Sequence, residues 1–414
     1  MFNDDRDKYV DYYAKYVSKG KVQLYQDFQM DIVPGSREGV IFEDINGKKF
    51  YNCHSNGGVF NLGHRNKEII NVLNNAVKDY DIGNHHLLSA GRALLGEKLA
   101  KVFPGNLNKV VYGVGGGEAI DLAIKLSRGY TGRYKILYAK GGYHGHTGLA
   151  LAAGERKYKE PFLPDTSDFV EVEYGNSKDV ISKLDSNTAA VIFETVEATG
   201  GIVIPPENFF GEVKKATEEN ETLFIIDEVQ TGWGRTGKLW GFEHFNVEPD
   251  IVVLGKGMSG GIYPISATIY NEKLESFFLR DPFIPISTFG GSEIGVLVAM
   301  KVLEISDSPQ FLEHVNNMAK LFYDGVNNII NSIPGIIVEF RQLGLMMGLK
   351  IKDEITSMMF LKYLFDNGIY TVYSGNDPSV IQLLPPLIIN EGEVFEVLNR
   401  IEKTTITVRE LVDG

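Results

Sequence analysis

Short apolar runs alternate with segments of helical spacing through roughly the middle two-thirds of the chain. The runs, rich in β-branched residues, lie near positions 109–113, 135–138, 189–193, 223–226 and 251–254. Continuous apolar strands of this kind are typical of parallel sheets that are buried on both faces. The alternation therefore predicts an α/β domain with a mostly parallel sheet and helices on both faces.

The two ends of the chain carry patterns of their own. Residues 4–18 have helical spacing, and the segments 40–44 and 48–51 predict a hairpin that turns at Asn46-Gly47. A helix is predicted at 293–306. After it, apolar runs return near 336–340, 346–351, 369–373 and 380–383. These runs predict a second, smaller α/β unit in the last quarter of the chain.

Length and composition allow two domains. The chain has 414 residues, of which 43% are hydrophobic and 23% charged, so it can bury a large core. We expect an N-terminal segment at 1–55, a large domain at 56–305 and a smaller C-terminal domain at 306–414.

Charge and cysteine content exclude several classes of partner. The formal net charge of -13 argues against nucleic acid or an anionic membrane, since both require a basic surface. Cys53 is the only cysteine, so the chain forms no intrachain disulfide and no thiolate metal cluster. The acidic N-terminus does not fit a signal peptide, and no apolar run approaches ~18 residues. We expect a cytoplasmic protein.

A lysine and a carboxylate follow two of the predicted strands. Lys256 stands in Ile-Val-Val-Leu-Gly-Lys-Gly, and Asp227 stands in Phe-Ile-Ile-Asp-Glu-Val-Gln. Parallel strands deliver such side chains to the carboxyl edge of a sheet. An amine that forms a Schiff base, beside a carboxylate that keeps a pyridine nitrogen protonated, suits pyridoxal phosphate. Either residue alone would more often be a strand cap or a loop start, but the pair, with the polar, glycine-rich stretch after Asp227, favours a cofactor site.

A glycine run joins another strand to a helix. Gly115, Gly116 and Gly117 follow the strand near 109–113 and precede a helical pattern. Free backbone amides and the positive end of the helix dipole at such a junction favour a phosphate. A tight turn without a ligand is the alternative interpretation.

The run from 222 to 261 resembles the signature of class III aminotransferases, which are fold-type-I pyridoxal phosphate enzymes, and the resemblance covers nearly the whole chain. It implies a large domain with a seven-stranded, mostly parallel sheet and a smaller α/β domain built from both termini. It also implies pyridoxal 5'-phosphate as cofactor, Lys256 and Asp227 as catalytic residues, and a homodimer or a dimer of dimers. The implied activity is transfer of an amino group from an amine to a 2-oxo acid.

The same resemblance implies further contacts with the cofactor. Tyr143, in the motif Tyr143-His144-Gly145, would stack on the ring, and Gln230 would donate toward the phenolic oxygen. Glu194 matches the family's acidic residue after its strand, and Thr288 would reach the cofactor phosphate of a partner subunit. The sequence departs from the family's usual pattern at several positions around these residues. Pro285 replaces a usual histidine, Ser292-Glu293 replaces Asn-Pro, and Gly115 and Gly117 replace hydroxyl side chains.

Three substitutions bear on the substrate. Gln382 and His146 stand where relatives have carboxylate-binding arginines, and Thr199 replaces a glutamate that screens one of them. An unpaired buried carboxylate is expensive, so we expect a donor without an α-carboxylate, such as a terminal amine, a diamine or an ω-amino compound. The chain looks most similar to putrescine-type enzymes, although those have arginine at the position of Gln382. Candidates for binding the acceptor carboxylate are Arg156, Lys157 and Arg341.

Two other functions fit the same motifs. A racemase or epimerase of an amino acid, amino amide or amino lactam needs no acceptor and, for an amide or lactam, no carboxylate clamp. A pyridoxal phosphate protein without catalysis is the third interpretation, which the retained Lys256, Asp227 and Gln230 disfavour. No metal is expected, because the adjacent His85 and His86 lack a carboxylate or cysteine at ligand spacing.

Overall fold

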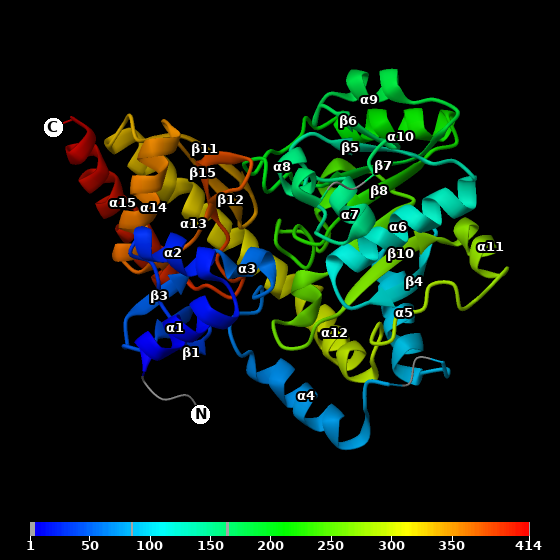
Figure 1. Cartoon of the computed structure of the whole chain (residues 1–414), viewed down its shortest axis with the longest axis horizontal. Coiled ribbons are helices and arrows are strands. Elements are labelled where there is room, and N and C mark those ends of the chain that lie inside the picture. Colours follow the sequence, from blue (N-terminus) through cyan, green and yellow to red (C-terminus); the bar gives the residue numbers. More distant parts are fainter. Residues whose placement is uncertain (1–4, 84–85, 163–164, 414) are drawn as a thin grey trace.

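The computed structural model describes residues 5–83, 86–162 and 165–413 (Figure 1). The strands of these residues form three sheets. A seven-stranded sheet has the order β4-β10-β9-β8-β7-β5-β6, and two four-stranded sheets have the orders β1-β2-β3-β13 and β11-β12-β15-β14. In Figure 1 the large sheet lies in one half of the molecule, and both termini lie in the other half.

The central sheet confirms the prediction of a mostly parallel α/β fold. Its strands are β4 (Leu107–Gly113), β5 (Lys135–Ala139), β6 (Phe169–Val172), β7 (Thr188–Glu194), β8 (Leu223–Asp227), β9 (Ile251–Leu254) and β10 (Ser266–Asn271). Strands β5 to β9 pair in parallel, whereas β10 runs antiparallel to both β4 and β9. All five predicted strands are present; β6 and β10 were not predicted.

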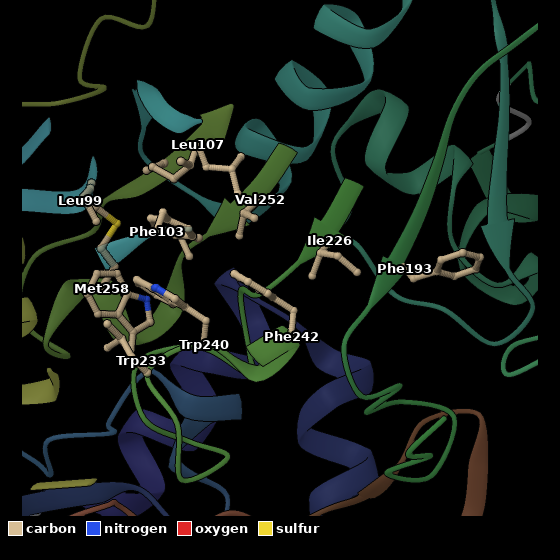
Figure 2. Close-up of a cluster of buried hydrophobic side chains, with 14 of the residues drawn as sticks. Leu99, Phe103, Leu107, Phe193, Ile226, Trp233, Trp240, Phe242, Val252 and Met258 are labelled. Atoms are coloured by element: carbon tan, nitrogen blue, oxygen red, sulfur yellow. The ribbon is translucent and has the colours of Figure 1, made fainter. Parts of the chain in front are cut away.

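Helices cover both faces of this sheet and explain the continuous apolar runs. On one face, Ile225 packs in a cluster with Ile120 and Ile124 of α6 (Gly116–Thr131). On the other face, Ile226 belongs to the cluster of Figure 2, with Phe193, Val252 and Trp240. Successive strand residues point to opposite faces, so a strand buried on both must be apolar at every position. The other helices of this half are α4 (Lys67–Asp79), α5 (Ala90–Val102), α7 (Gly148–Ala152), α8 (Arg156–Lys159), α9 (Ser177–Lys183), α10 (Phe209–Glu219), α11 (Glu275–Phe278) and α12 (Glu293–Ser306).

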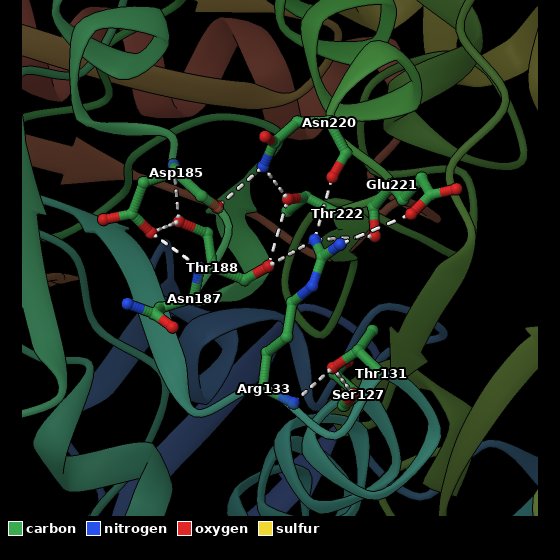
Figure 3. Close-up of polar contacts among 9 residues, drawn as sticks. All are labelled: Ser127, Thr131, Arg133, Asp185, Asn187, Thr188, Asn220, Glu221 and Thr222. Atoms are coloured by element: carbon green, nitrogen blue, oxygen red, sulfur yellow. Dashed lines mark hydrogen bonds and ion pairs between the residues drawn. The ribbon is translucent and has the colours of Figure 1, made fainter.

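At the amino end of strands β5, β7 and β8, a polar cluster fastens the turns (Figure 3). Arg133 Nη1 donates to the carbonyl oxygens of Asn220 at 2.8 Å, Glu221 at 3.2 Å and Thr188 at 3.3 Å. Thr222 Oγ1 also donates to Thr188 O at 3.1 Å, and Asn220 Nδ2 donates to Asp185 O at 2.9 Å. The guanidinium thus joins the turn before β5 to the turns before β7 and β8.

The smaller sheets bring the two ends of the chain together. The predicted hairpin is β2 (Ile41–Asp44) and β3 (Lys49–Asn52), and its turn contains Gly47 with φ of 88°. The neighbouring strands are β1 (Pro34–Glu38) and β13 (Ile369–Tyr370), and β13 pairs in parallel with β3. The third sheet contains β11 (Ile337–Leu343), β12 (Met346–Ile351), β14 (Tyr373–Ser374) and β15 (Asp377–Leu383). Helices α13 (Pro309–Ser332), α14 (Glu354–Asp366) and α15 (Glu391–Asp413) complete this half. The domain boundaries at 55 and 305 stay a prediction.

The N-terminal region, predicted as one helix over residues 4–18, contains two helices in the structure. Helix α1 (Arg6–Tyr16) ends at Val17, and the Ser18 hydroxyl accepts from Lys21 N to start α2 (Lys19–Asp27). Serine favours such an N-cap because its side chain satisfies a free amide. Neither helix contains a buried residue. In the part of the chain that the structure describes, no helix is long and apolar enough to cross a membrane. The remaining short elements are α3 (Ser55–Gly58), η1 (Glu160–Phe162), η2 (Gly241–Phe245), η3 (Lys256–Ser259) and η4 (Glu272–Leu274).

Candidate active site

The carboxyl ends of neighbouring strands gather the predicted site residues. Glu194 and Asp227 end β7 and β8 and lie opposite each other in the strand register. Lys256 begins η3, two residues after β9. Its φ is 40°, a left-handed conformation that costs energy for a residue with a side chain. Strain of this kind is typical of functional sites.

The Lys256 amine faces a polar partner and an open space. Lys256 Nζ donates to Gln230 Oε1 at 2.8 Å. Burial lowers the pKa of Lys256, and the charges of Asp227 and Glu194 only partly oppose this effect. A Cβ placed on Gly57 would lie 3.2 Å from Nζ, so the missing side chain keeps the space beside the amine free. A lysine with a lowered pKa is a better nucleophile and proton carrier near neutral pH.

Asp227 is held from two sides. Its Oδ1 accepts from Val229 N at 2.9 Å, and its Oδ2 lies 2.7 Å from His144 Nδ1. Burial disfavours the charged form of His144, but the hydrogen bond with Asp227 and the charges of Asp227 and Glu194 outweigh burial and raise the pKa of His144. The His144 ring therefore orients the carboxylate. Whether His144 also contacts the cofactor stays a prediction.

Glu194 fixes the aromatic residue predicted to stack on the cofactor. Its Oε1 accepts from Tyr143 N at 3.0 Å. Burial, together with nearby acidic groups, raises the pKa of Glu194. The Tyr143 ring meets His146 edge-on at 5.5 Å and Tyr158 at 5.7 Å between ring centroids. Three aromatic rings thus gather beside the carboxyl edge, and Tyr158 was not predicted.

The glycine run begins helix α6 without a side-chain cap. The first amides of a helix have no partner within it, so they are available to an anion. A Cβ on Gly116 would lie 3.1 Å from Val229 Cγ1, and one on Gly117 would lie 2.9 Å from Thr147 Oγ1. The Thr147 hydroxyl does not cap the helix α7 that it precedes. Thr147 therefore brings a hydroxyl to the loop, a contact that the sequence pattern does not reveal.

The predicted substrate residues hold the backbone beside the site. Gln382 is buried, and its Nε2 donates to Ala198 O at 3.2 Å and to Ser374 Oγ at 3.3 Å. Thr199 Oγ1 donates to Gly141 O at 3.2 Å. His146 is exposed. Their roles in binding substrate stay predictions.

The three cations considered for the acceptor carboxylate are engaged with groups of the chain. Arg341 donates to Gly201 O at 2.7 Å and pairs with Glu339. Arg156 pairs with Glu160 at 3.0 Å, and Lys157 donates to Gly375 O. Arg341 is largely buried and held in place, whereas Arg156 and Lys157 are exposed, and exposed ion pairs contribute so little that these two remain available to a substrate carboxylate.

Thr288 lies in the loop between α11 and α12, two residues before Gly290, which contacts Tyr112 near the carboxyl end of β4. Thr288 is exposed, as are the neighbouring Phe283, Ile284, Ile286 and Phe289. His85, of the histidine pair, lies outside the described residues. Among the described residues, no group of three or more histidine, cysteine or acidic side chains could hold a metal ion.

Two buried charged residues that sequence patterns did not single out hold the loop after β8. Glu228 accepts from Thr195 Oγ1 and Thr231 Oγ1, and from the amides of Gly241 and Phe242, both at 2.8 Å. Burial raises the pKa of Glu228 to about 7, although these donors oppose it.

Arg235, fully buried, joins that loop to other parts of the chain. It donates to Leu345 O at 3.0 Å, to Pro385 O at 2.6 Å and to Asn61 Oδ1 at 2.7 Å. In the sequence, only the position of Glu228 and Arg235 in the polar stretch after Asp227 pointed to a role. Most of the groups that they bond are distant in sequence.

Comparisons with known proteins agree with this fold. The model of the family "Aminotransferase class-III" matches residues 25–405. An uncharacterized aminotransferase of Archaeoglobus fulgidus is 50% identical over 385 residues, which cover 93% of this chain and 91% of that protein. Among solved structures, a transaminase from the marine bacterium Virgibacillus has a TM-score of 0.91 at 23% identity, covering 98% of this chain and 100% of that one. The ornithine aminotransferase of Toxoplasma gondii also has a TM-score of 0.91 at 23% identity, over 99% of this chain and 96% of that one. At this identity the solved structures establish the fold alone.

Proposed function

The chain belongs to the class III aminotransferase family, and from this premise we propose that it transfers the amino group of a primary amine without an α-carboxylate to a 2-oxo acid. The proposed cofactor is pyridoxal 5'-phosphate. The observation that carries the proposal is the presence of two hydrogen-bonded pairs at the strand ends, Lys256 with Gln230 and Asp227 with His144.

The residues present fit this cofactor. Lys256 Nζ, with free space beside Gly57, would hold the aldehyde carbon, and Asp227 would pair with the ring nitrogen. The amides at the start of α6 and the Thr147 hydroxyl would hold the phosphate. When bound, pyridoxal phosphate supplies an electron sink for the substrate carbon.

Lys256 and Asp227 then divide the protein's part of the chemistry. Lys256 Nζ would take the proton from the substrate carbon and deliver it to the cofactor carbon that carried the aldehyde, and its lowered pKa suits both steps near neutral pH. Asp227 would keep the ring nitrogen protonated, with His144 orienting its carboxylate. Tyr143 would cover one ring face and help to exclude water.

The donor class follows from the missing cations. The Gln382 amide is buried and bonded to backbone, so it offers no positive charge to an α-carboxylate. Leaving such a carboxylate buried and unpaired would cost several kcal/mol on the order-of-magnitude scale for buried charges. A donor without that group avoids the cost, and the carboxylate of the 2-oxo acid acceptor would pair with Arg156 or Lys157, which are exposed.

A homodimer completes the proposed site. The exposed apolar side chains around Thr288 would contact a second copy of the chain, as would Leu87, Leu88 and Leu94. Exposed apolar groups gathered in this way mark interaction surfaces. Thr288 would then donate to the cofactor phosphate of the partner subunit.

The test is an absorption spectrum of the purified holoenzyme after addition of pentylamine without a 2-oxo acid. Conversion to the aminated cofactor, reversed by a 2-oxo acid, is expected. Lys256→Ala should lower turnover by roughly 10⁴-fold, because nucleophile and proton carrier are lost together.

A parallel sample that receives an amino amide tests the second candidate function, a racemase. This function is also favoured by Gln382 and His146, which stand where relatives have arginine. An unchanged cofactor with pentylamine, together with loss of optical purity in an amino amide, would contradict the aminotransferase proposal and support the racemase. A cofactor spectrum that no amine changes, together with unchanged optical purity of the amino amide, would indicate a protein without catalysis.

A further inference from the structure

The loop that carries Tyr143 lies where the two halves of the molecule meet. In Figure 1, helix α8 lies on the side of the large-sheet half that faces the other half. From that other half, Asn376 in the turn between β14 and β15 donates through Nδ2 to Gly141 O at 2.6 Å. Its backbone N also donates to Thr199 O at 2.8 Å. These bonds hold the turn, with the neighbouring Gly375, beside the loop that carries Tyr143.

The ring of Tyr143 is oriented by two other rings. Its backbone is fixed, because Tyr143 N donates to Glu194 Oε1 at 3.0 Å, but this bond does not set the angle of the side chain. Tyr158 of α8 meets the Tyr143 ring at 78° and the His146 ring at 81°, with 5.7 and 5.8 Å between ring centroids. Edge-to-face pairs of this kind prefer a defined angle between the two rings. His146 is exposed and Tyr158 is half-buried, so Tyr158 is the firmer of the two supports.

The turn of the smaller sheet limits the movement of Tyr158. A Cβ on Gly375 would lie 2.4 Å from Tyr158 Oη but 3.7 Å from its Cζ. The missing side chain of Gly375 thus makes room for the Tyr158 hydroxyl, and a methyl group there would displace it. Burial, together with nearby tyrosine and acidic groups, raises the pKa of Tyr158, so the hydroxyl stays protonated near neutral pH. Tyr158 therefore acts through its shape and not as a base.

We propose that Tyr158 is a positioning residue that holds the Tyr143 ring at the angle at which it covers the cofactor. This inference rests on the proposed function, in which Tyr143 lies on one face of the pyridine ring. Groups that contact a cofactor directly keep a productive orientation only when neighbouring side chains restrict their rotamers. Through Gly375, the same contact connects the smaller sheet with the cofactor face.

The experiment adds one methyl group beside the Tyr158 hydroxyl. Gly375 is not among the residues with positive φ, so alanine fits its backbone. In Gly375→Ala the new carbon lies too close to Tyr158 Oη, so the Tyr158 ring must turn and the Tyr143 ring must follow. We expect the circular dichroism of the bound cofactor to change and kcat/KM with pentylamine to fall about two- to tenfold, which corresponds to the energy of one aromatic pair.

Tyr158→Phe provides the matched background, because it keeps the ring and removes the hydroxyl that the methyl group meets. In this background Gly375→Ala should cause no further change in dichroism or kcat/KM, since 3.7 Å to Cζ is an ordinary contact distance. An equal loss in both backgrounds overturns the inference, and so does wild-type behaviour of the single Gly375→Ala variant. Gly20→Ala in α2 adds a methyl group within 4 Å of no described atom, and this control should behave like wild type.

Two leucine variants separate this inference from the proposed function. If Tyr143 covers the cofactor, Tyr143→Leu should change the dichroism of the bound cofactor, and Tyr158→Leu should change it in the same direction by a smaller amount. Tyr323→Leu removes a tyrosine ring from α13 and should keep the wild-type spectrum. A change in Tyr143→Leu without one in Tyr158→Leu overturns only the inference. No change in either variant contradicts the stacking of Tyr143 and overturns the inference with it, whereas turnover of pentylamine by wild type still decides the aminotransferase proposal.

Discussion

Strands β7 and β8 carry polar clusters at both ends, and the two clusters differ in how completely they are bonded. At the amino end, Arg133 and Thr222 donate to carbonyl oxygens of neighbouring turns. At the carboxyl end, His144 Nε2 and Glu197 Oε1 are buried without a partner in the described chain, and Lys256 has a left-handed backbone. Both features cost free energy, and native folds retain them chiefly at functional sites. The comparison teaches that the amino end serves stability, whereas the carboxyl end keeps groups available for ligands.

Among the variants that compare the two ends, Asp227→Asn should produce the largest effect and show most clearly that only the carboxyl end supports activity. The amide keeps the shape of the side chain but loses the negative charge that we propose faces the ring nitrogen of the cofactor. We expect kcat to fall roughly 10²- to 10³-fold, as when one preorganised electrostatic group is removed. Steady-state kinetics at saturating cofactor give the value. Asp185→Asn makes the same change in the amino-end cluster and should retain wild-type kcat; equal losses in the two variants would contradict the comparison.

Glu197→Gln tests whether a buried, unpaired carboxylate at the carboxyl end lowers the stability of the fold. Burial, with a smaller effect of Glu155, raises the pKa of Glu197 to about 8. Because this exceeds the unfolded value of roughly 4.3, the folded state binds the extra proton and loses stability as pH rises from about 4 to 8. The free energy of unfolding of the variant should exceed that of wild type by on the order of 5 kcal/mol at pH 8.5, with no such gain near pH 4. Urea unfolding at both pH values measures the difference, and a gain independent of pH would refute the assignment.

Arg133→Met tests the stabilising role of the amino end. The variant leaves carbonyl oxygens of Asn220, Glu221 and Thr188 without this donor. We expect a loss of about 2 kcal/mol in the free energy of unfolding, since each buried hydrogen bond contributes about 1 kcal/mol. The kcat of the folded variant should equal that of wild type. Lys215→Met, on the exposed side of α10, is the control; a drop in kcat for Arg133→Met would show that the ends are not separate.

Thr147→Val should have the smallest effect of these variants, and we expect the effect to be confined to cofactor binding. Loss of the hydroxyl beside Gly117 is expected to raise the dissociation constant of pyridoxal phosphate about tenfold, because a hydrogen bond to a charged group contributes about 1.5 kcal/mol or more. Fluorescence titration of the apoenzyme measures this constant. Thr147→Ser keeps the hydroxyl and should bind like wild type, whereas equal weakening in both variants would exclude the proposed contact.

Local patterns predicted much of the fold but few of its long-range contacts. The strand that ends at Asp227 and the strand that precedes Lys256 were evident because burial on both faces demands continuous apolar runs. Glu171 interrupts the apolar run of strand β6, and β10 mixes polar with apolar residues, so neither matched the pattern of a continuous apolar run.

Contacts between distant residues explain what sequence could not give. Thr147 meets Gly117, and Arg235 meets Leu345 and Pro385, because the fold brings separate segments together. The predicted helix over 4–18 continued beyond its true end, since Ser18 starts a new helix instead of extending the first. The sequence shows that Gln382 lacks the positive charge of an arginine, and only the structure shows that its amide donates to Ala198 O.

The pairing of β3 with β13 has a consequence for the order in which the protein assembles during synthesis. Residues 49–52 leave the ribosome more than 300 residues before their partner strand at Ile369–Tyr370. Chains fold domain by domain as they emerge, so the central sheet can form while the N-terminal strands still await their neighbour. An unpaired strand edge promotes association between chains. Crowded polysomes that carry this message should therefore be the stage at which the protein most needs chaperones.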